Sequence, residues 1–157
     1  MSNVNSLLVI NLRGMVKLRH DVKRTLRQLR IERRYTATVI SDNEVNRGML
    51  HVLQTQTAWC KADPETLSLL ITSRGRSSMR KHVTDEVAKS LGYEDIAGLA
   101  RAISEGTLRL VETSSIKPFF RLHPPRGGFL RSTRRMYTQG GVLGENPSLP
   151  EILKKML

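Results

Sequence analysis

The histidines and the cysteine are the residues that could give this chain a metal site or a catalytic centre. Consecutive histidines lie about thirty residues or more apart, which is not the spacing of metal ligands on one element: they are His20, His51, His82 and His123. Cys60 is the single cysteine, so it lacks a thiolate partner for zinc and cannot form an intramolecular disulfide. The residues therefore predict no metal and no cofactor, and they fit a reducing compartment.

Motifs for nucleophilic catalysis and nucleotide binding are also missing from the sequence. The chain has no GxSxG, no GxxxxGKS or GxxxxGKT, and no GxGxxG between a strand and a helix. Residues 74–78 have the glycine and serines of a phosphate loop but lack its lysine. The acidic pairs at 85–86 and 94–95 are sequence neighbours, which do not face each other on a helix. We therefore expect no enzyme and no small-molecule substrate.

The charge balance points to a class of partner. The 157 residues include 26 Lys and Arg against 14 Asp and Glu, a net charge of +12. Such a surface attracts polyanions, and nucleic acid is the commonest one inside cells. With 39% hydrophobic residues the chain should fold. Its apolar runs are too short for a membrane span and do not resemble a secretory signal. We expect a soluble cytoplasmic protein that binds no membrane.

The first basic cluster follows the period of a helix. Its members step by four, four and three residues and fall within about 80° of arc: Arg19, Lys23, Arg27 and Arg30. They adjoin an apolar stripe at Val22, Leu26 and Leu29, so one face of the helix would pack on the core while its flank meets phosphates. Arg13 and Lys17 extend this patch. A merely solvated cationic face is the alternative.

A second cluster places cations among small residues, at Arg74, Arg76, Arg80 and Lys81. Arginine forks bind phosphate oxygens in pairs, and small residues between them let a backbone approach. A disordered surface loop explains the pattern as well. Arg47, followed by Gly48, is also open to two interpretations. Gly48 either lets an RNA backbone approach Arg47 or relieves crowding between a helix and a sheet.

The third cluster is the most specific and lies in residues 113–144, which contain no acid. Consecutive prolines stiffen its backbone and a glycine pair permits a turn. Either His123 or Phe129 could stack on an unpaired base. The residues expected to contact RNA are Arg121, His123, Arg126, Gly127, Gly128, Arg131, Arg134 and Arg135. We expect an irregular loop that becomes ordered on binding. A proline-rich ligand for another protein is the alternative, which the absence of acids disfavours.

The elements that must hold these clusters alternate in the first third of the chain. Apolar or β-branched runs indicate strands, and apolar stripes of helical period indicate helices. They predict a strand at 7–10, a helix over 18–30, a strand at 35–40, a helix over 45–53 and a strand at 55–61. This β-α-β-α-β order favours a sheet with helices packed on one face.

The pattern changes after residue 62. Asp63 can cap a helix that has Pro64 at its first position. Further patterns predict helices over 84–91 and 95–104, a short strand at 108–111, and a last helical turn or two within 150–157.

Four segments resemble one known family. They are Leu12-Arg13-Gly14, Arg47-Gly48-Met49, Leu-His-Pro-Pro-Arg-Gly-Gly at 122–128 and Gly-Gly-Val-Leu-Gly at 140–144. On these residues the chain resembles the large-subunit ribosomal protein number thirty in its longer archaeal form. The same family includes the eukaryotic large-subunit protein number seven. The resemblance covers nearly the whole chain.

The resemblance implies an α+β protein with a ferredoxin-like β-α-β-α-β core at residues 1–62. A C-terminal helical and loop extension at 63–157 would pack on the core and on rRNA. It also implies residence in the large ribosomal subunit, with 23S rRNA, the vicinity of 5S rRNA and other large-subunit proteins as partners. We expect a structural role, in which basic residues neutralise phosphates where RNA segments converge. The rivals are a free DNA-binding regulator and a small enzyme acting on RNA or nucleotides.

Overall fold

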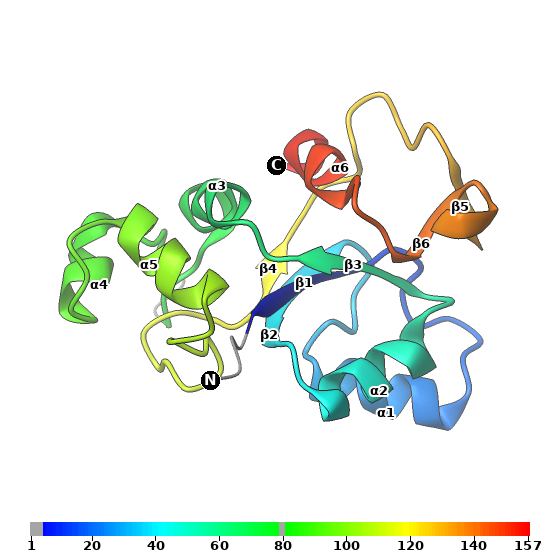
Figure 1. The fold of residues 1–157 in the computed structure, drawn as a ribbon, viewed down its shortest axis with the longest axis horizontal. Coiled ribbons are helices and arrows are strands. Elements are labelled where there is room, and N and C mark those ends of the chain that lie inside the picture. Colours follow the sequence, from blue (N-terminus) through cyan, green and yellow to red (C-terminus); the bar gives the residue numbers. More distant parts are fainter. Residues whose placement is uncertain (1–4, 79–80) are drawn as a thin grey trace.

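The computed structural model describes residues 5–78 and 81–157, and it places them around one mixed sheet with helices on both faces (Figure 1). The strands are β1 (Ser6–Asn11), β2 (Thr36–Ser41), β3 (Thr57–Lys61), β4 (Phe120–Arg121), β5 (Ser132–Met136) and β6 (Gly141–Glu145). The helices are α1 (His20–Gln28), α2 (Glu44–Leu53), α3 (Pro64–Arg74), α4 (Asp85–Ser90), α5 (Ile96–Ser104) and α6 (Leu149–Met156), with a 3-10 turn, η1 (Tyr137–Gln139). The strand order is β4-β2-β1-β3-β6-β5.

The central strand β1 runs antiparallel to both of its neighbours, β2 and β3. Because both neighbours oppose β1, they are parallel to each other with β1 inserted between them. Each is reached through a helix, so the first three strands form the split β-α-β arrangement of ferredoxin-like folds. The predicted α+β fold class and the β-α-β-α-β order of the first sixty residues are confirmed.

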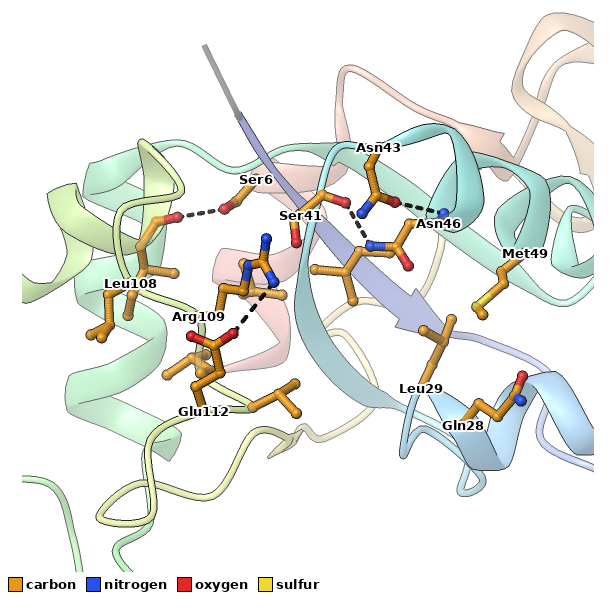
Figure 2. Close-up of a pocket in the computed structure, with 15 residues that line it drawn as sticks. Ser6, Gln28, Leu29, Ser41, Asn43, Asn46, Met49, Leu108, Arg109 and Glu112 are labelled. Atoms are coloured by element: carbon orange, nitrogen blue, oxygen red, sulfur yellow. Dashed lines mark hydrogen bonds and ion pairs between the residues drawn. The ribbon is translucent and has the colours of Figure 1, made fainter. Parts of the chain in front are cut away.

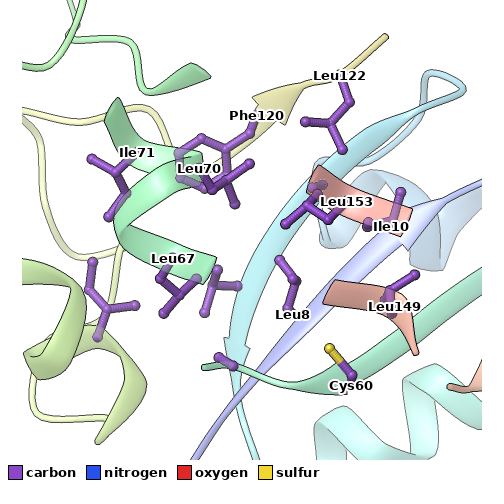
Figure 3. Packing of buried hydrophobic residues seen from close by; sticks show 14 of the residues in the cluster. Leu8, Ile10, Cys60, Leu67, Leu70, Ile71, Phe120, Leu122, Leu149 and Leu153 are labelled. Carbon is purple, nitrogen blue, oxygen red and sulfur yellow. The ribbon is translucent and has the colours of Figure 1, made fainter. Parts of the chain in front are cut away.

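Both faces of β1 are buried, which explains why its sequence is apolar at consecutive positions. Leu7 and Val9 face α1 and α2, as expected for helices packed on one side. Leu8 and Ile10 face the opposite side, where α3, α5 and α6 supply a larger cluster (Figure 3). The expectation of helices on one face, made for the first sixty residues, is confirmed by α1 and α2. The helices of the later residues cover the opposite face.

Two helix starts are capped by side chains, and the cap at Asp63 is the predicted one. Asn43 accepts a hydrogen bond from the Asn46 backbone N–H at 2.8 Å at the start of α2. Asp63 accepts one from the Thr66 N–H at 3.3 Å, with Pro64 at the first position of α3. Such side-chain acceptors satisfy N–H groups that have no partner within the helix. The predicted helices α4, α5 and α6 are present as well.

Two predictions for the extension are wrong. Residues 108–111 form no strand but a turn, closed by a hydrogen bond from the Thr113 N–H to the Leu110 carbonyl. Residues 113–144 are not an irregular loop, because they contribute β4, β5 and most of β6. A Cβ on Gly141 would come within 1.9 Å of the Arg135 carbonyl oxygen. That glycine therefore permits the pairing of β5 with β6 rather than marking a loop.

Candidate RNA-binding surface

The basic residues of the first cluster surround α1. Arg19 occupies its N-cap position, Arg27 and Arg30 are exposed near its end, and Lys23 is half-buried. Arg27 pairs with Glu32, with 3.3 Å between Nε and Oε1. The flank is shorter than predicted, because only two of its members, Lys23 and Arg27, lie within α1 and Arg30 follows its end with a positive φ of 60°.

Arg13 and Lys17 are both exposed in the connection before α1. Arg13 donates a hydrogen bond to the Thr55 carbonyl at 3.2 Å, which directs its side chain along the end of the sheet. Lys17 adopts a positive φ of 55°. These two residues extend the charge of α1 toward β3.

Two clefts meet at the outer edge of β4. The first has a volume of about 460 Å³ and is lined by Arg74, Arg76, Lys117, Phe119 and Arg121. The second has a volume of about 370 Å³ and is lined by Arg27, Arg30, Glu32, Arg33, Thr36, Phe119 and Arg121. Phe119 and Arg121 line both clefts, so we call the two clefts together the Phe119 junction. Among the described residues that line it, Glu32 is the one carboxylate.

The backbone just before Phe119 is held by two neighbouring segments. The Lys117 N–H donates to the Arg76 carbonyl at 2.9 Å, and the Thr38 hydroxyl donates to the Pro118 carbonyl at 2.8 Å. The Arg121 guanidinium lies 6.0 Å from the centre of the Phe119 ring, a cation–π distance. The cations of the junction are thus brought together from α1, β4 and the segment after α3 by main-chain pairing.

Arg74 is tied to the end of the chain rather than free in its cleft. Its Nη2 donates to the main-chain oxygen of Leu157, and its Nε is buried without a hydrogen-bond partner in the described part of the chain. An unpaired buried donor costs roughly 1–3 kcal/mol. Arg74 therefore joins α3 to α6 and presents its remaining donors from a fixed position.

The segment after α3 has an ordered backbone at the residues that the structure describes. Arg76 forms a β-bridge with His82, and Ser77 forms one with Ile116. The disordered-loop interpretation is therefore wrong for residues 76–78 and 81–82. Lys81 is exposed, and the predicted contact residue Arg80 lies outside the described residues.

The segment 122–131 crosses above the sheet and is held to the last helix by its backbone (Figure 1). The His123 N–H donates to the Met156 carbonyl and the Arg126 N–H donates to the Lys155 carbonyl, at 3.1 and 3.0 Å. The side chains of both residues are exposed. The expected exposure of this segment is present, although it is anchored rather than free.

Glycines and an aromatic pair shape the end of this segment. Gly127 and Gly128 have φ values of 80° and 73° with open space around them. Phe129 stacks on Tyr35 with 6.4 Å between ring centres. This ring is half-buried and packs against the core, so Tyr35 already occupies one of its faces, and the suggestion that Phe129 stacks on a base stays a prediction.

The other edge of the sheet carries the remaining arginines of the third cluster. Arg134 and Arg135 are exposed on β5, and the Arg131 guanidinium lies 5.0 Å from the Tyr137 ring centre. Two of these charges lie on β5, and the third directly precedes it.

Arg47 is already paired within the chain. Its guanidinium donates two hydrogen bonds to the Asp42 carboxylate, at 2.5 and 2.8 Å. These hydrogen bonds hold the pKa of Asp42 below its ordinary value. A Cβ on Gly48 would meet nothing within 4 Å. Crowding between helix and sheet therefore does not explain this glycine, and open access beside Arg47 is the interpretation that remains.

Sequence reasoning missed two arginines that follow α1. Arg33 lines the second cleft. Arg34 donates from Nε to the Leu12 carbonyl at 3.0 Å and lies 4.8 Å from the Tyr35 ring centre. The sequence signal for these two residues is that they are adjacent arginines. Adjacent residues have no helical period, so helical spacing does not reveal them.

Comparison with known proteins now identifies the family. The chain is 39% identical over 153 residues to the large ribosomal subunit protein uL30 of Nitrosopumilus maritimus, covering 98% of this chain and 99% of the relative. The proteins of that name from Staphylothermus marinus and Aeropyrum pernix are each 40% identical, covering 95% of this chain and 96% and 97% of theirs. The chain belongs to the uL30 family.

The uL30 assignment confirms the resemblance drawn from the four short motifs. The family model described as ribosomal protein L30p/L7e matches residues 7–54, which run from β1 to the end of α2. The full-length relatives extend the similarity over the later helices and the segment 122–131. Both halves of the chain therefore carry the family relationship.

This uL30-family chain also has a cavity of about 330 Å³ with a different lining (Figure 2). Neutral groups such as Ser41, Asn43 and Asn46 line it, and its Arg109 pairs with Glu112 at 3.3 Å. Because its charges cancel, this cavity offers no set of cations for phosphates.

Groups suited to other chemistry are not gathered in the described residues. Burial raises the pKa of the Cys60 thiol to about 12, so this side chain stays protonated at neutral pH. Over residues 5–78 and 81–157, no three His, Cys, Asp or Glu side chains converge to hold a metal ion. The same residues include no helix long and apolar enough to span a membrane.

Proposed function

We propose that the chain is a structural constituent of the large ribosomal subunit, where it binds 23S rRNA near 5S rRNA and stabilises the folded RNA during translation. The observation that carries this proposal is the similarity from end to end to proteins named large ribosomal subunit protein uL30. A net charge of +12 and the cationic Phe119 junction support RNA as the partner. In the subunit the chain would reside in the cytoplasm beside other large-subunit proteins.

The Phe119 junction is the centre of the proposed interface. Arginines from separate elements converge there with one carboxylate among the described lining residues. Further contacts are proposed from exposed cations and from the glycine turn: Arg13, Lys17, Arg19, Lys81, His123, Arg126, Gly127, Gly128, Arg131, Arg134 and Arg135. Lys23 is half-buried and Arg47 is paired with Asp42, so we assign them smaller contributions.

The proposed mechanism is positioning rather than catalysis. Half or more of the contacts should go to phosphate and sugar, which fix the protein on RNA without reading sequence. Specificity would come from RNA shape and from a few unpaired bases. We assign the chain no enzymatic step and no cofactor.

We also propose that residues 1–62 form the core and that 63–157 form an extension packed on it. One hydrophobic cluster supports the packing of the extension on the core. It joins Leu8 and Ile10 of β1 to Leu70 of α3 and Leu153 of α6 (Figure 3). The extension would then fix the orientation of β4, on which the junction depends.

Sedimentation of the native protein tests the proposal. Cell lysate is washed at moderate salt and separated on a sucrose gradient, and the chain is quantified in each fraction. We expect about one copy per large subunit. Recovery at the top of the gradient, or with DNA, would overturn the ribosomal assignment and favour a DNA-binding regulator.

A further inference from the structure

Phe119 is an aromatic residue placed among cations instead of among apolar side chains. Its neighbour Phe120 is fully buried in the larger hydrophobic cluster. Phe119 is half-buried, and within the described residues it belongs to neither hydrophobic cluster. Both clefts of the junction reach it. A ring held in this way offers a hydrophobic surface in a site whose other groups bind phosphate.

We propose that the Phe119 junction binds one unpaired ribonucleotide, with its base stacked on the Phe119 ring and its two flanking phosphates in the two clefts. This inference rests on the proposed RNA-binding function and specifies the form of RNA at one site. Stacking on an aromatic ring requires a base that has left its helix, because paired bases in an A-form duplex are stacked on each other.

The charges of the two clefts fit the two phosphates. In the first cleft Arg74 is tied to Leu157. Arg76 and Lys117 therefore remain to face a phosphate there, and the described lining residues include no carboxylate. The second contains Glu32, but that carboxylate is paired with Arg27. Arg30 and Arg33 therefore remain to face a phosphate there. Arg121 lines both clefts and can serve either one.

The site is held in place before any ligand binds. The main-chain bond from Lys117 to Arg76 and the hydroxyl bond from Thr38 to Pro118 fix the backbone before Phe119. The hydrogen bond from the Leu122 N–H to the Tyr35 carbonyl at 2.9 Å fixes it beyond Arg121. Little conformational freedom is then lost on binding, which favours affinity.

Binding of two labelled RNA hairpins tests the proposal. One hairpin carries a single bulged uridine, the other is fully paired, and both are titrated with the full-length chain by fluorescence anisotropy. The wild-type chain should bind the bulged hairpin roughly 5- to 150-fold more tightly, the range expected for stacking one base on an aromatic ring. Equal affinity for both hairpins would contradict the proposal that a base stacks on Phe119, while the proposed RNA-binding function would stand. Failure to bind either would overturn both proposals.

Two variants of the ring isolate stacking from charge. Phe119→Leu keeps an apolar side chain but removes the flat face, so the ratio of the affinities for the bulged and the paired hairpin should fall to about one. Phe119→Trp, the matched control, keeps the face and should keep the preference. A Phe119→Leu chain that still prefers the bulge would contradict the proposal.

Cross-linking provides a measurement that needs no variant. The bulged uridine is replaced by 4-thiouridine, the wild-type complex is irradiated, and the cross-linked tryptic peptide is identified by mass spectrometry. Trypsin cuts after Arg109 and Arg121 but not between Lys117 and Pro118. The label should therefore appear on the peptide 110–121. A cross-link confined to peptides beyond residue 121 would place the base elsewhere and overturn the site.

Discussion

The two edges of the sheet present arginines in different ways. At the β4 edge, cations from α1 and from the segment after α3 surround Phe119 and Arg121. At the β5 edge, Arg134 and Arg135 follow each other along one strand. A converging set can enclose a phosphate, whereas charges along one strand remain separately solvated. The same residue type therefore has different binding capacity at the two edges.

The difference arises from what lies behind each edge. β4 is two residues long, yet its Phe120 is fully buried and anchors the strand in the core. The residues of β5 are exposed or half-buried and depend on pairing with β6. The comparison shows that a buried neighbour can position a surface charge better than the length of the strand does.

Removing the buried anchor should have the largest effect. Phe120→Ala leaves a cavity in the core, and we expect a loss of about 3–5 kcal/mol in the free energy of unfolding. Met136→Ala on β5 is the matched change and should cost less, because Met136 is only half-buried. Urea denaturation measures both. Similar losses at the two edges would contradict the difference in anchoring.

Charge removal from the β4 edge and the segment that follows it, compared with charge removal from the β5 edge, should separate RNA affinity from stability. Each hydrogen bond to a charged group contributes about 1.5–3 kcal/mol, so Arg121→Ala together with Arg126→Ala should weaken RNA binding at least roughly 10-fold. Because both side chains are exposed, the melting temperature should change little. Arg134→Ala with Arg135→Ala is the control with equal charge loss and should weaken binding less. A large fall in melting temperature without loss of binding would remove Arg121 and Arg126 as RNA ligands.

A glycine at the β5 edge allows that edge to be disturbed alone. Gly141→Ala would place a Cβ against the Arg135 carbonyl, so we expect a loss of about 1–3 kcal/mol in stability from overpacking. RNA binding at the β4 edge should persist. Thermal unfolding and anisotropy measure the two effects. Unchanged stability would show that β5 does not approach β6 as closely as the structure has it.

Gly48→Ala should have the smallest effect and the opposite sign. The position is exposed in α2 with no atom within 4 Å of an added Cβ. Alanine should therefore raise stability by about 0.5–1 kcal/mol through helix propensity. If RNA approaches beside Arg47, the same variant should bind RNA more weakly. If the variant is more stable but binds RNA with unchanged affinity, the interpretation that an RNA backbone approaches Gly48 closely would be wrong.

The parts of the fold that the sequence predicted are those with a strong local pattern. Leu7 to Ile10 are apolar because both faces of β1 are covered, and Asp63 caps α3 by a local hydrogen bond. β6 escaped prediction because its glycines resemble a loop until β5 and β3 are placed beside it. The close approach of Gly141 to Arg135 appears only in the folded chain.

The sequence predicted which basic regions contribute to the candidate site, but it did not predict how these regions meet in space. Helical spacing indicated the flank of α1, and the acid-free segment indicated residues near Arg121. The meeting of these two regions at Phe119 depends on the pairing of β4 with β2, which joins residues about eighty positions apart. Periodicity within one segment contains no information about such a contact. For the same reason, it did not show that Phe129 is engaged with Tyr35.

Protection of arginines from phenylglyoxal tests the central claim most directly. Salt-washed large subunits and the free chain are modified in parallel, and each arginine is quantified by mass spectrometry. If the Phe119 junction contacts RNA, Arg121 and Arg30 should be strongly protected from phenylglyoxal in the subunit, and Arg134 should be protected less. Equal reactivity of Arg121 in the free chain and in the subunit would contradict the claim.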